Sequence, residues 1–185
     1  MCSSDLLNNV VAIYSTDSAF AALKNDGAVV TWGGSDNGGN SVTVSQDLKS
    51  DVQSIFATNS AFAALKNDGS VVTWGSDFSG GDSVAVSQDL KSDVQSIYVN
   101  SDAFAALKSN GTVVTWGYNE YGGNSTAVAA NLRDVVAIYS TNYAFAALKS
   151  DGTVVTWGYD SSGGNSTAVA ANLTDVVAIY SKNSA

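Results

Sequence analysis

Aromatic and acidic side chains gather at one recurring place in this sequence, directly after each Trp-Gly pair. The four segments are Gly34-Ser35-Asp36-Asn37, Ser76-Asp77-Phe78-Ser79, Tyr118-Asn119-Glu120-Tyr121 and Tyr159-Asp160-Ser161-Ser162. Exposed aromatic rings beside charged groups are typical of protein interfaces. The alternative is that these segments are ordinary turns. We take eight of their residues as candidates for contact with a partner: Asp36, Asp77, Phe78, Tyr118, Glu120, Tyr121, Tyr159 and Asp160.

Catalytic chemistry has few residues to draw on. The chain contains no His and a single Cys, Cys2, and Glu120 is its only Glu. His is the most frequent general base in enzymes, and a Ser or Asp nucleophile needs such a base beside it. The phosphate-binding pattern Gly-x-x-x-x-Gly-Lys-Ser/Thr is also missing. The sequence therefore predicts a protein that is not an enzyme and has no catalytic residues.

Asp residues in Gly-rich loops are the remaining candidates for holding a cofactor. Asp77 with Asp82 would offer oxygen ligands of the kind that calcium takes. The ordered spacing Asp-x-Asp-x-Asp-Gly is missing, however, and Asp is common in turns because its side chain bonds to its own backbone. We expect no metal and no cofactor, with calcium as the alternative.

Charge and hydropathy exclude several classes of partner. Eight basic and 17 acidic side chains in 185 residues give a formal net charge of −9, which argues against binding a nucleic-acid backbone. The apolar runs are too short for membrane insertion. Hydrophobic residues make up 45% and charged residues 14% of the chain, a composition that favours a folded domain over disorder.

One repeat of about 42 residues accounts for nearly the whole chain. The hexapeptide Ala-Phe-Ala-Ala-Leu-Lys begins at Ala19, Ala61, Ala103 and Ala144. Thr-Trp-Gly follows at Thr31, Thr73, Thr115 and Thr156. Both series recur at intervals of 42, 42 and 41 residues. A third element, Val-x-x-Ile, occurs five times, at Val10, Val52, Val94, Val135 and Val176.

These elements divide the chain into four full repeats: 8–50, 51–92, 93–133 and 134–174. Residues 175–185 form the first strand of a truncated fifth repeat. Residues 1–7 are interpreted as a non-native N-terminus, because Cys2 to Leu6 resembles a translated sequencing adapter. We therefore expect a fragment of a larger array, with a closed four-repeat ring as the alternative.

Each repeat is predicted to hold three strands. The first, such as 135–139, is β-branched and aromatic and apolar on both faces, which predicts burial on both sides. The second and third strands flank Asp-Gly or Asn-Gly, a strong signal for a tight hairpin in which Gly adopts positive φ. The structural Gly residues of these turns are Gly27, Gly69, Gly111 and Gly152. The structural Trp residues, expected to fill the space between neighbouring units, are Trp32, Trp74, Trp116 and Trp157.

The rest of each repeat is interpreted as a loop with an apolar anchor. Antiparallel units of this length are typical of propeller blades. A β-solenoid is the rival architecture, but it favours parallel strands. The prediction is an all-β, propeller-like array of four antiparallel blades plus an orphan strand.

The repeat also resembles a known family. Leu-x-x-Asp-Gly-x-Val-x-x-Trp-Gly, seen at 23–33, resembles the regulator-of-chromosome-condensation repeat, and especially a short-blade branch that includes a secreted bacterial β-lactamase inhibitor. The resemblance implies a propeller, usually of seven blades, and an extracellular or cell-surface bacterial setting. The family often has His where Ala19 stands, and its Gly-Gln-Leu-Gly is replaced here by Gly-Gly-Asn/Asp-Ser.

We therefore expect a non-enzymatic repeat module that binds a protein or a glycan through the loops after Trp-Gly. An enzyme inhibitor and a structural spacer without a ligand are the alternatives. Open strand edges are expected to permit self-association. A second variable place, which includes Ser101-Asp102 and Asn142-Tyr143, is interpreted as a turn.

Overall fold

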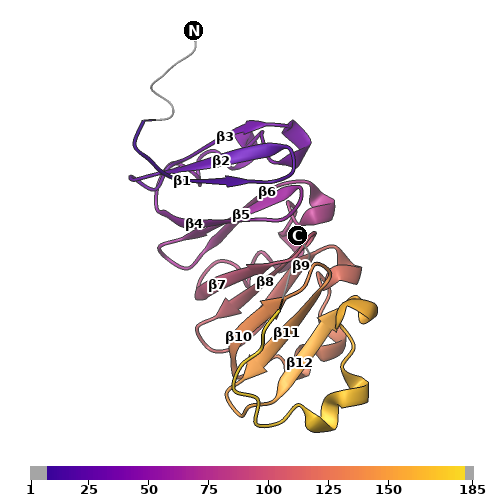
Figure 1. Ribbon diagram of the computed structural model, residues 1–185. Helices are drawn as coiled ribbons and strands as arrows, with labels where there is room; N and C mark the ends of the chain where they lie inside the picture. The colour runs from indigo at the N-terminus through magenta and orange to yellow at the C-terminus, as the bar shows by residue number, and fades with distance from the viewer. Residues whose placement is uncertain (1–7, 182–185) are drawn as a thin grey trace.

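The computed structural model describes residues 8–181 and shows four separate antiparallel sheets of three strands each (Figure 1). Within every sheet the strands follow one another in chain order. The predicted all-β array of four antiparallel units is confirmed. The strands are β1 (Val10–Ser15), β2 (Ala19–Lys24), β3 (Val29–Gly33), β4 (Val52–Ala57), β5 (Ala61–Lys66), β6 (Val71–Gly75), β7 (Val94–Val99), β8 (Ala103–Lys108), β9 (Val113–Gly117), β10 (Val135–Ser140), β11 (Ala144–Lys149) and β12 (Val154–Gly158).

Short 3-10 helices connect one sheet to the next. The first follows the third strand and the second precedes the next repeat, where the interpretation from sequence was a loop with an apolar anchor. That anchor is a buried Leu, represented by Leu48, Leu90 and Leu132. The helices are η1 (Ser35–Asn37), η2 (Val42–Val44), η3 (Asp77–Ser79), η4 (Val84–Val86), η5 (Asn119–Tyr121), η6 (Thr126–Asn131), η7 (Asp160–Ser162) and η8 (Thr167–Asn172).

The second and third strands form the predicted tight hairpins, and the Gly in each turn also contacts the next repeat. Gly27 has φ 77°, and a Cβ there would lie 2.6 Å from the backbone nitrogen of Asp51. Val52 N–H donates to the Gly27 carbonyl at 3.1 Å. Gly is needed here both for its backbone conformation and for this close approach.

A β-bulge in the first strand decides which of its side chains are buried. In β10 the pairing with β11 shifts by one residue between Val135 and Ala137. In a regular strand, Val135 and Ile138 would point to opposite faces. The extra residue brings both to one buried face, while Val136 is 55% exposed. The opposite face is partly buried, because Phe56 of β4 and Tyr98 of β7 pack against the following sheet. The expected burial on both faces therefore fails only at the bulge residue.

The core lies between successive sheets. Each sheet packs against the following one through a surface that we call its trailing face. In repeat 1 this face includes Ala19, Ala21 and Leu23 of the second strand. The surface of the following sheet that covers it is called the leading face, and in repeat 2 it consists of Val52, Ile55, Phe62, Ala64 and Trp74. The same arrangement recurs between repeats 2 and 3 and between repeats 3 and 4. Small Ala side chains let the sheets approach closely, and the large rings fill the remaining space.

The two ends of the array differ from its interior. The first and last sheets lie at opposite ends of the stack (Figure 1). Residues 176–181 do not form the predicted strand, because a first strand pairs with the second strand of its own sheet and none follows them among the described residues. Residues 182–185 of that prediction lie outside the described residues. The predicted non-native segment 1–7 lies outside the described residues. In the part of the chain that is described, no helix is long and apolar enough to span a membrane.

Candidate aromatic binding surface

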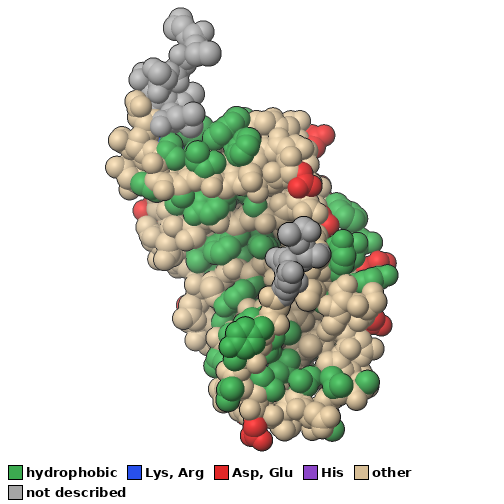
Figure 2. Space-filling view, viewed as in Figure 1, with side chains coloured by type: hydrophobic (Ala, Val, Ile, Leu, Met, Phe, Trp, Pro, Cys, Tyr) green, Lys and Arg blue, Asp and Glu red, His purple; other side chains and the backbone are tan. Residues whose placement is uncertain are grey.

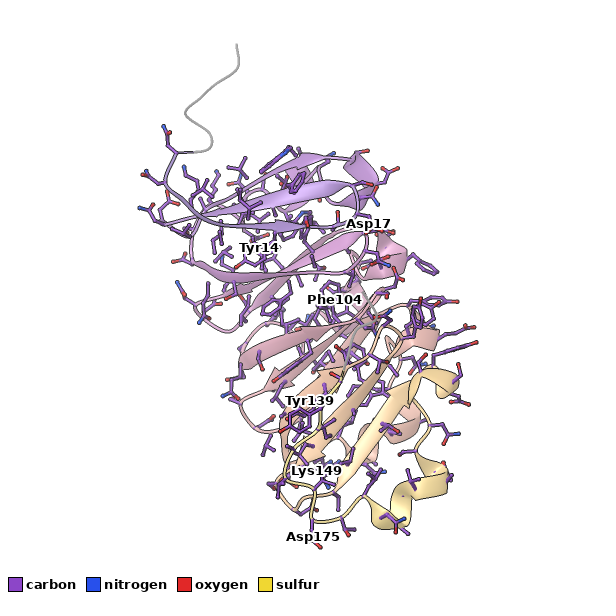
Figure 3. The ribbon with its side chains drawn as sticks, in the orientation of Figure 1. Tyr14, Asp17, Phe104, Tyr139, Lys149 and Asp175 are labelled. Atoms are coloured by element: carbon purple, nitrogen blue, oxygen red, sulfur yellow. The ribbon has the colours of Figure 1, made fainter. Side chains whose placement is uncertain are left out.

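The strands of each sheet end on two opposite sides of the molecule, and these sides differ in chemistry. One side, which we call the loop edge, holds the turns between first and second strands together with the 3-10 helices that follow the third strands. The hairpin edge holds the Gly turns between second and third strands. Figure 3 shows Asp17 at the loop edge, Lys149 and Asp175 at the hairpin edge of the last sheet, and Phe104 between sheets.

Hydrogen bonds tie the loop edges of neighbouring repeats together. Backbone N–H groups of Asp17, Asn59 and Ser101 donate to the carbonyls of Asn59, Ser101 and Asn142, at 2.9, 2.8 and 3.0 Å. These bonds run from each repeat to the next, so the loop edges are held in a fixed order along the array.

The 3-10 helix η3 is also fastened to repeats 2 and 3. Thr58 Oγ1 donates to the Ser79 carbonyl at 3.0 Å, and Ser79 Oγ donates to Asp102 Oδ1 at 2.6 Å. Ser79 is buried, so the helix is anchored while the neighbouring Phe78 projects outward with 58% exposure. Phe78 is therefore presented on a rigid support.

The predicted aromatic residues come together across three repeats. Phe78 and Tyr118 have ring centroids 4.3 Å apart, and Tyr118 meets Tyr121 edge-on at 4.7 Å. Tyr121 in turn lies 4.5 Å from Tyr143 and 6.2 Å from Tyr159. We call Phe78, Tyr118, Tyr121, Tyr143 and Tyr159 the aromatic row. Such contacts between rings stabilise one another beyond the area they bury, so the row forms one continuous surface.

Much of the aromatic row faces solvent. Tyr159 is 46% and Tyr143 37% exposed, whereas Tyr118 and Tyr121 are half-buried between their neighbours. Figure 2 shows hydrophobic and acidic side chains close together along this side of the molecule. An exposed group of rings of this kind is typical of an interaction site.

The four predicted acidic residues are exposed beside these loops: Asp36, Asp77, Glu120 and Asp160. Asp36 belongs to repeat 1, whose loop carries no aromatic residue, and it accepts a hydrogen bond from Ser35 Oγ at 3.0 Å. It therefore lies beyond the end of the aromatic row, while the other three acids flank the row.

Two residues of this surface were not among the eight candidates. Tyr143 and Asp102 lie in the turns between first and second strands, which the sequence analysis interpreted only as turns. The hairpin pattern could have indicated them. The second and third strands are antiparallel, so the turn before the second strand and the loop after the third lie at the same edge of the sheet. The structure shows this directly, because Gly34 N–H donates to the Ser18 carbonyl and Tyr159 N–H to the Tyr143 carbonyl.

The charge of the loop edge is one-sided. Between residues 8 and 181, every basic side chain lies at the hairpin edge or in the segment that leads into the next repeat: Lys24, Lys49, Lys66, Lys91, Lys108, Arg133 and Lys149. The aromatic row is therefore flanked by carboxylates without local neutralisation, which favours a partner that carries positive charge.

The environment of the row shifts the titration of its two central tyrosines. Desolvation by the surrounding rings raises the pKa of Tyr121, and electrostatic interactions with Tyr143 and Asp102 add to the shift. Desolvation also raises the pKa of Tyr118, followed by the charge of Glu120. Both hydroxyls stay protonated at neutral pH and can donate hydrogen bonds to a partner.

Many of the other Asp and Asn side chains stabilise turns. Asp82 Oδ1 accepts the Val84 N–H at 2.8 Å, so one oxygen of the calcium candidate already serves a turn. Hydrogen bonds from the Ser70 hydroxyl and then the Ser70 backbone N–H lower the pKa of Asp68. Across the described ranges, no three His, Cys, Asp or Glu side chains lie close enough to share a metal ion. The calcium alternative stays a prediction.

Comparison with known proteins places this architecture. Residues 94–122, within repeat 3, match the Regulator of chromosome condensation (RCC1) repeat. The match thus covers one of the four repeats, and the other three carry the same sequence pattern. No curated protein matches the chain in sequence. The resemblance seen in the sequence is thus confirmed for the repeat and the fold, whereas the likeness to the short-blade inhibitor branch stays a prediction.

Solved structures support the propeller-type fold of this array. Prp20p from Saccharomyces cerevisiae, described with its binding to Gsp1p and histones, superposes with a TM-score of 0.55 at 15% identity, over 83% of this chain and 46% of its own. Yeast RCC1 (Prp20) in complex with Kap60 gives 0.56 at 19%, over 80% and 43%. The ectodomain of the Arabidopsis thaliana receptor kinase ACR4 gives 0.54 at 18%, over 80% and 52%. The chain thus spans about half the length of these structures.

Proposed function

We propose that this RCC1-type array is a non-enzymatic binding module that holds a protein partner against its aromatic row. The observation that carries the proposal is the continuity of the row over repeats 2 to 4, with Phe78 and Tyr159 exposed and Tyr121 in contact with rings on both sides. Interface energy concentrates in Tyr, Trp and other large side chains held in fixed positions.

The rigidity of the surface supports this function. The loop edges are hydrogen-bonded from repeat to repeat, and η3 is fastened through Ser79. Little conformational entropy is then lost when a partner immobilises the rings. Prp20p, which shares the fold, is described with protein-binding properties, which supports the use of this scaffold to bind proteins.

The charges narrow the class of partner. Asp77, Glu120 and Asp160 flank the row without a nearby Lys or Arg among residues 8–181. A partner with an apolar centre and a Lys- or Arg-rich rim matches this pattern. Binding of this kind needs no cofactor, and we expect it to survive chelation of divalent cations and to weaken as salt rises.

The test compares two double variants that each remove two exposed apolar side chains. Phe78→Ser with Tyr159→Ser removes rings of the row that are 58% and 46% exposed. Val42→Ser with Val84→Ser removes side chains that are 75% and 77% exposed, outside the row. Both are screened with the parent chain against a displayed peptide library and a glycan array.

The proposal expects basic, aromatic or apolar peptides to bind the parent chain and the Val42/Val84 variant alike. The row variant should bind roughly thirtyfold or more weakly, the loss typical of an interface hot spot. Equal binding by all three chains would refute the row as the site. Binding to glycans alone would favour the glycan alternative, and no binding to either library would favour a structural spacer.

Inhibition of an enzyme is a second candidate function, because an inhibitor needs one contiguous face over several repeats and the aromatic row supplies one. It predicts that Tyr118→Ala with Tyr121→Ala abolishes inhibition of a susceptible enzyme without unfolding the chain.

We also propose an extracellular or cell-surface bacterial setting, on the resemblance to the secreted short-blade branch. Export of the parent protein in its native host would test that setting.

A further inference from the structure

The first sheet presents a leading face that is buried in every other repeat. Phe62, Phe104 and Phe145 are at most 1% exposed, whereas Phe20 is 45% exposed. Trp74, Trp116 and Trp157 are 3–4% exposed, whereas Trp32 is 37% exposed. Phe20 and Trp32 nevertheless stack at 5.3 Å as the other pairs do, so the pair is preformed without its cover.

The last sheet presents the complementary seat, at which no Phe–Trp pair from residues 8–181 lies. A Cβ on Gly38, Gly80 or Gly122 would meet the Phe of the following repeat at 2.5–2.8 Å, but a Cβ on Gly163 would meet nothing within 4 Å. A cavity of about 240 Å³ lies there, lined by Ala144, Ala146, Gly163 and Tyr139, among others. Ala146 is half-buried, unlike its fully buried counterparts in repeats 1 to 3.

One hydrogen bond is missing at both ends in the same way. Trp74, Trp116 and Trp157 donate their Nε1–H to the carbonyls of Gly38, Gly80 and Gly122, at 3.0–3.1 Å. Among residues 8–181, Trp32 Nε1 has no acceptor and the Gly163 carbonyl has no donor. A donor and an acceptor that pair in three successive interfaces are thus left unpaired at the two ends.

We propose that a second copy of this chain docks head to tail, with its Phe20–Trp32 pair seated at Gly163 of the first copy. The occupant is identified by the three interfaces inside the chain, because the same residues meet there on both sides. Trp32 Nε1–H then donates to the Gly163 carbonyl, and Phe20 fills the cavity beside Ala144 and Ala146. The contact is heterologous, so it closes into a ring or continues as a filament, depending on the rotation between copies.

The segment after repeat 4 competes with this docking. Residues 176–181 read Val-Val-Ala-Ile-Tyr-Ser, identical to β1. Val176 N–H donates to the Gly152 carbonyl at 2.9 Å, the bond that also begins β4, β7 and β10, and Ile179 lines the cavity. This segment therefore occupies the place of the first strand of a following sheet. An incoming copy brings the same six residues as β1, so it displaces the segment without changing the chemistry of the contact.

The test uses a plug variant, Phe20→Ser with Trp32→Ser, and a seat variant, Ala146→Arg. The Val42→Ser with Val84→Ser chain is the matched control. Each is studied by light scattering and sedimentation over a range of concentrations, and circular dichroism verifies that it is folded. The parent and control chains should associate, and the plug and seat variants should associate roughly thirtyfold or more weakly.

A mixture of the two defective variants makes the test independent of folding defects. The seat variant retains a plug and the plug variant retains a seat, so together they form one intact contact. The mixture should yield a two-chain species that neither variant forms alone. In addition, Ile179→Asp should tighten association of the parent chain, because it weakens the competing segment.

A parent chain that stays monomeric up to the highest soluble concentration would overturn the proposal, and would leave a further repeat of a longer protein as the natural cover of these faces. Association that persists in both variants, or a mixture that forms no two-chain species, would also overturn it.

Discussion

The Trp side chains offer a sharp test of how the repeats are held together, because one of the four lacks the contacts of the others. We consider Trp116→Phe, with Trp32→Phe as its matched control. Trp116 is 4% exposed, stacks on Phe104 at 5.0 Å and donates to the Gly80 carbonyl at 3.1 Å. Trp32 occupies the same place in the sequence repeat but is 37% exposed.

The expected loss for Trp116→Phe has two parts. Leaving the Gly80 carbonyl buried without its donor costs about 1–3 kcal/mol. Removing part of a buried ring system costs about 1–2 kcal/mol more through lost burial and an imperfectly filled space. The free energy of unfolding should therefore fall by about 2–5 kcal/mol, whereas Trp32→Phe should cost under about 1 kcal/mol, as exposed sites usually do.

The assay is urea unfolding followed by far-ultraviolet circular dichroism, which does not depend on Trp fluorescence. It is run at low protein concentration, because head-to-tail docking would bury Trp32 and raise the cost of its substitution. Equal losses for the two variants would refute the reasoning that the inter-repeat hydrogen bond and burial, rather than the local hairpin, make this Trp important.

Three further predictions follow from matched positions. Gly122→Ala and Gly163→Ala share a φ near 98° and so a similar backbone strain, but only Gly122→Ala places a Cβ 2.8 Å from the Phe145 ring. Gly122→Ala should therefore lower the free energy of unfolding in urea by about 1–3 kcal/mol more than Gly163→Ala. Equal losses would contradict the seat at Gly163. The lowered pKa of Asp68 gives stability that is present above the ordinary Asp pKa of 3.8 and is lost as pH falls through the lowered pKa. Asp68→Asn, which copies repeat 3, should remove that acid-sensitive part of the unfolding free energy, and an unchanged pH profile would argue against it. The raised pKa of Tyr121 gives stability that is present below pH 10 and lost as pH rises through the folded-state pKa. Compared with the parent chain, the ultraviolet titration of Tyr121→Phe should lack one phenol that titrates above 10. Loss of a phenol that titrates near 10 would contradict the shift.

The division of the chain into repeats and the three strands of each could be predicted because the signals are local. Asp-Gly or Asn-Gly between apolar segments specifies a hairpin, and alternation along Ala19 to Lys24 separates two faces. The bulge at Val135–Ala137 is not part of the sequence prediction. Val135 and Ile138 are three residues apart, so a regular strand would place them on opposite faces, and only a bulge lets both be buried on one face.

The candidate surface could be predicted only in part. Variable segments after Trp-Gly indicated Phe78, Tyr118, Tyr121 and Tyr159, and these rings do lie together. Tyr143 joins them from a turn of repeat 4, and sequence reasoning that took each variable segment separately did not combine the two.

By itself, the sequence determined the repeat length, the strands, the hairpins and the acidic, aromatic character of one set of loops, since each depends on neighbours along the chain. Only the tertiary structure decided that the rings form a single row, that the trailing Ala face of one sheet receives the Phe–Trp pair of the next, and that one such pair and one such seat remain uncovered. The physical reason is that four nearly identical sequences have different environments. The free energy of burial depends on the sheet that stands opposite. Phe20 and Phe104 lie in the same hexapeptide, but only Phe104 has a preceding sheet packed against it.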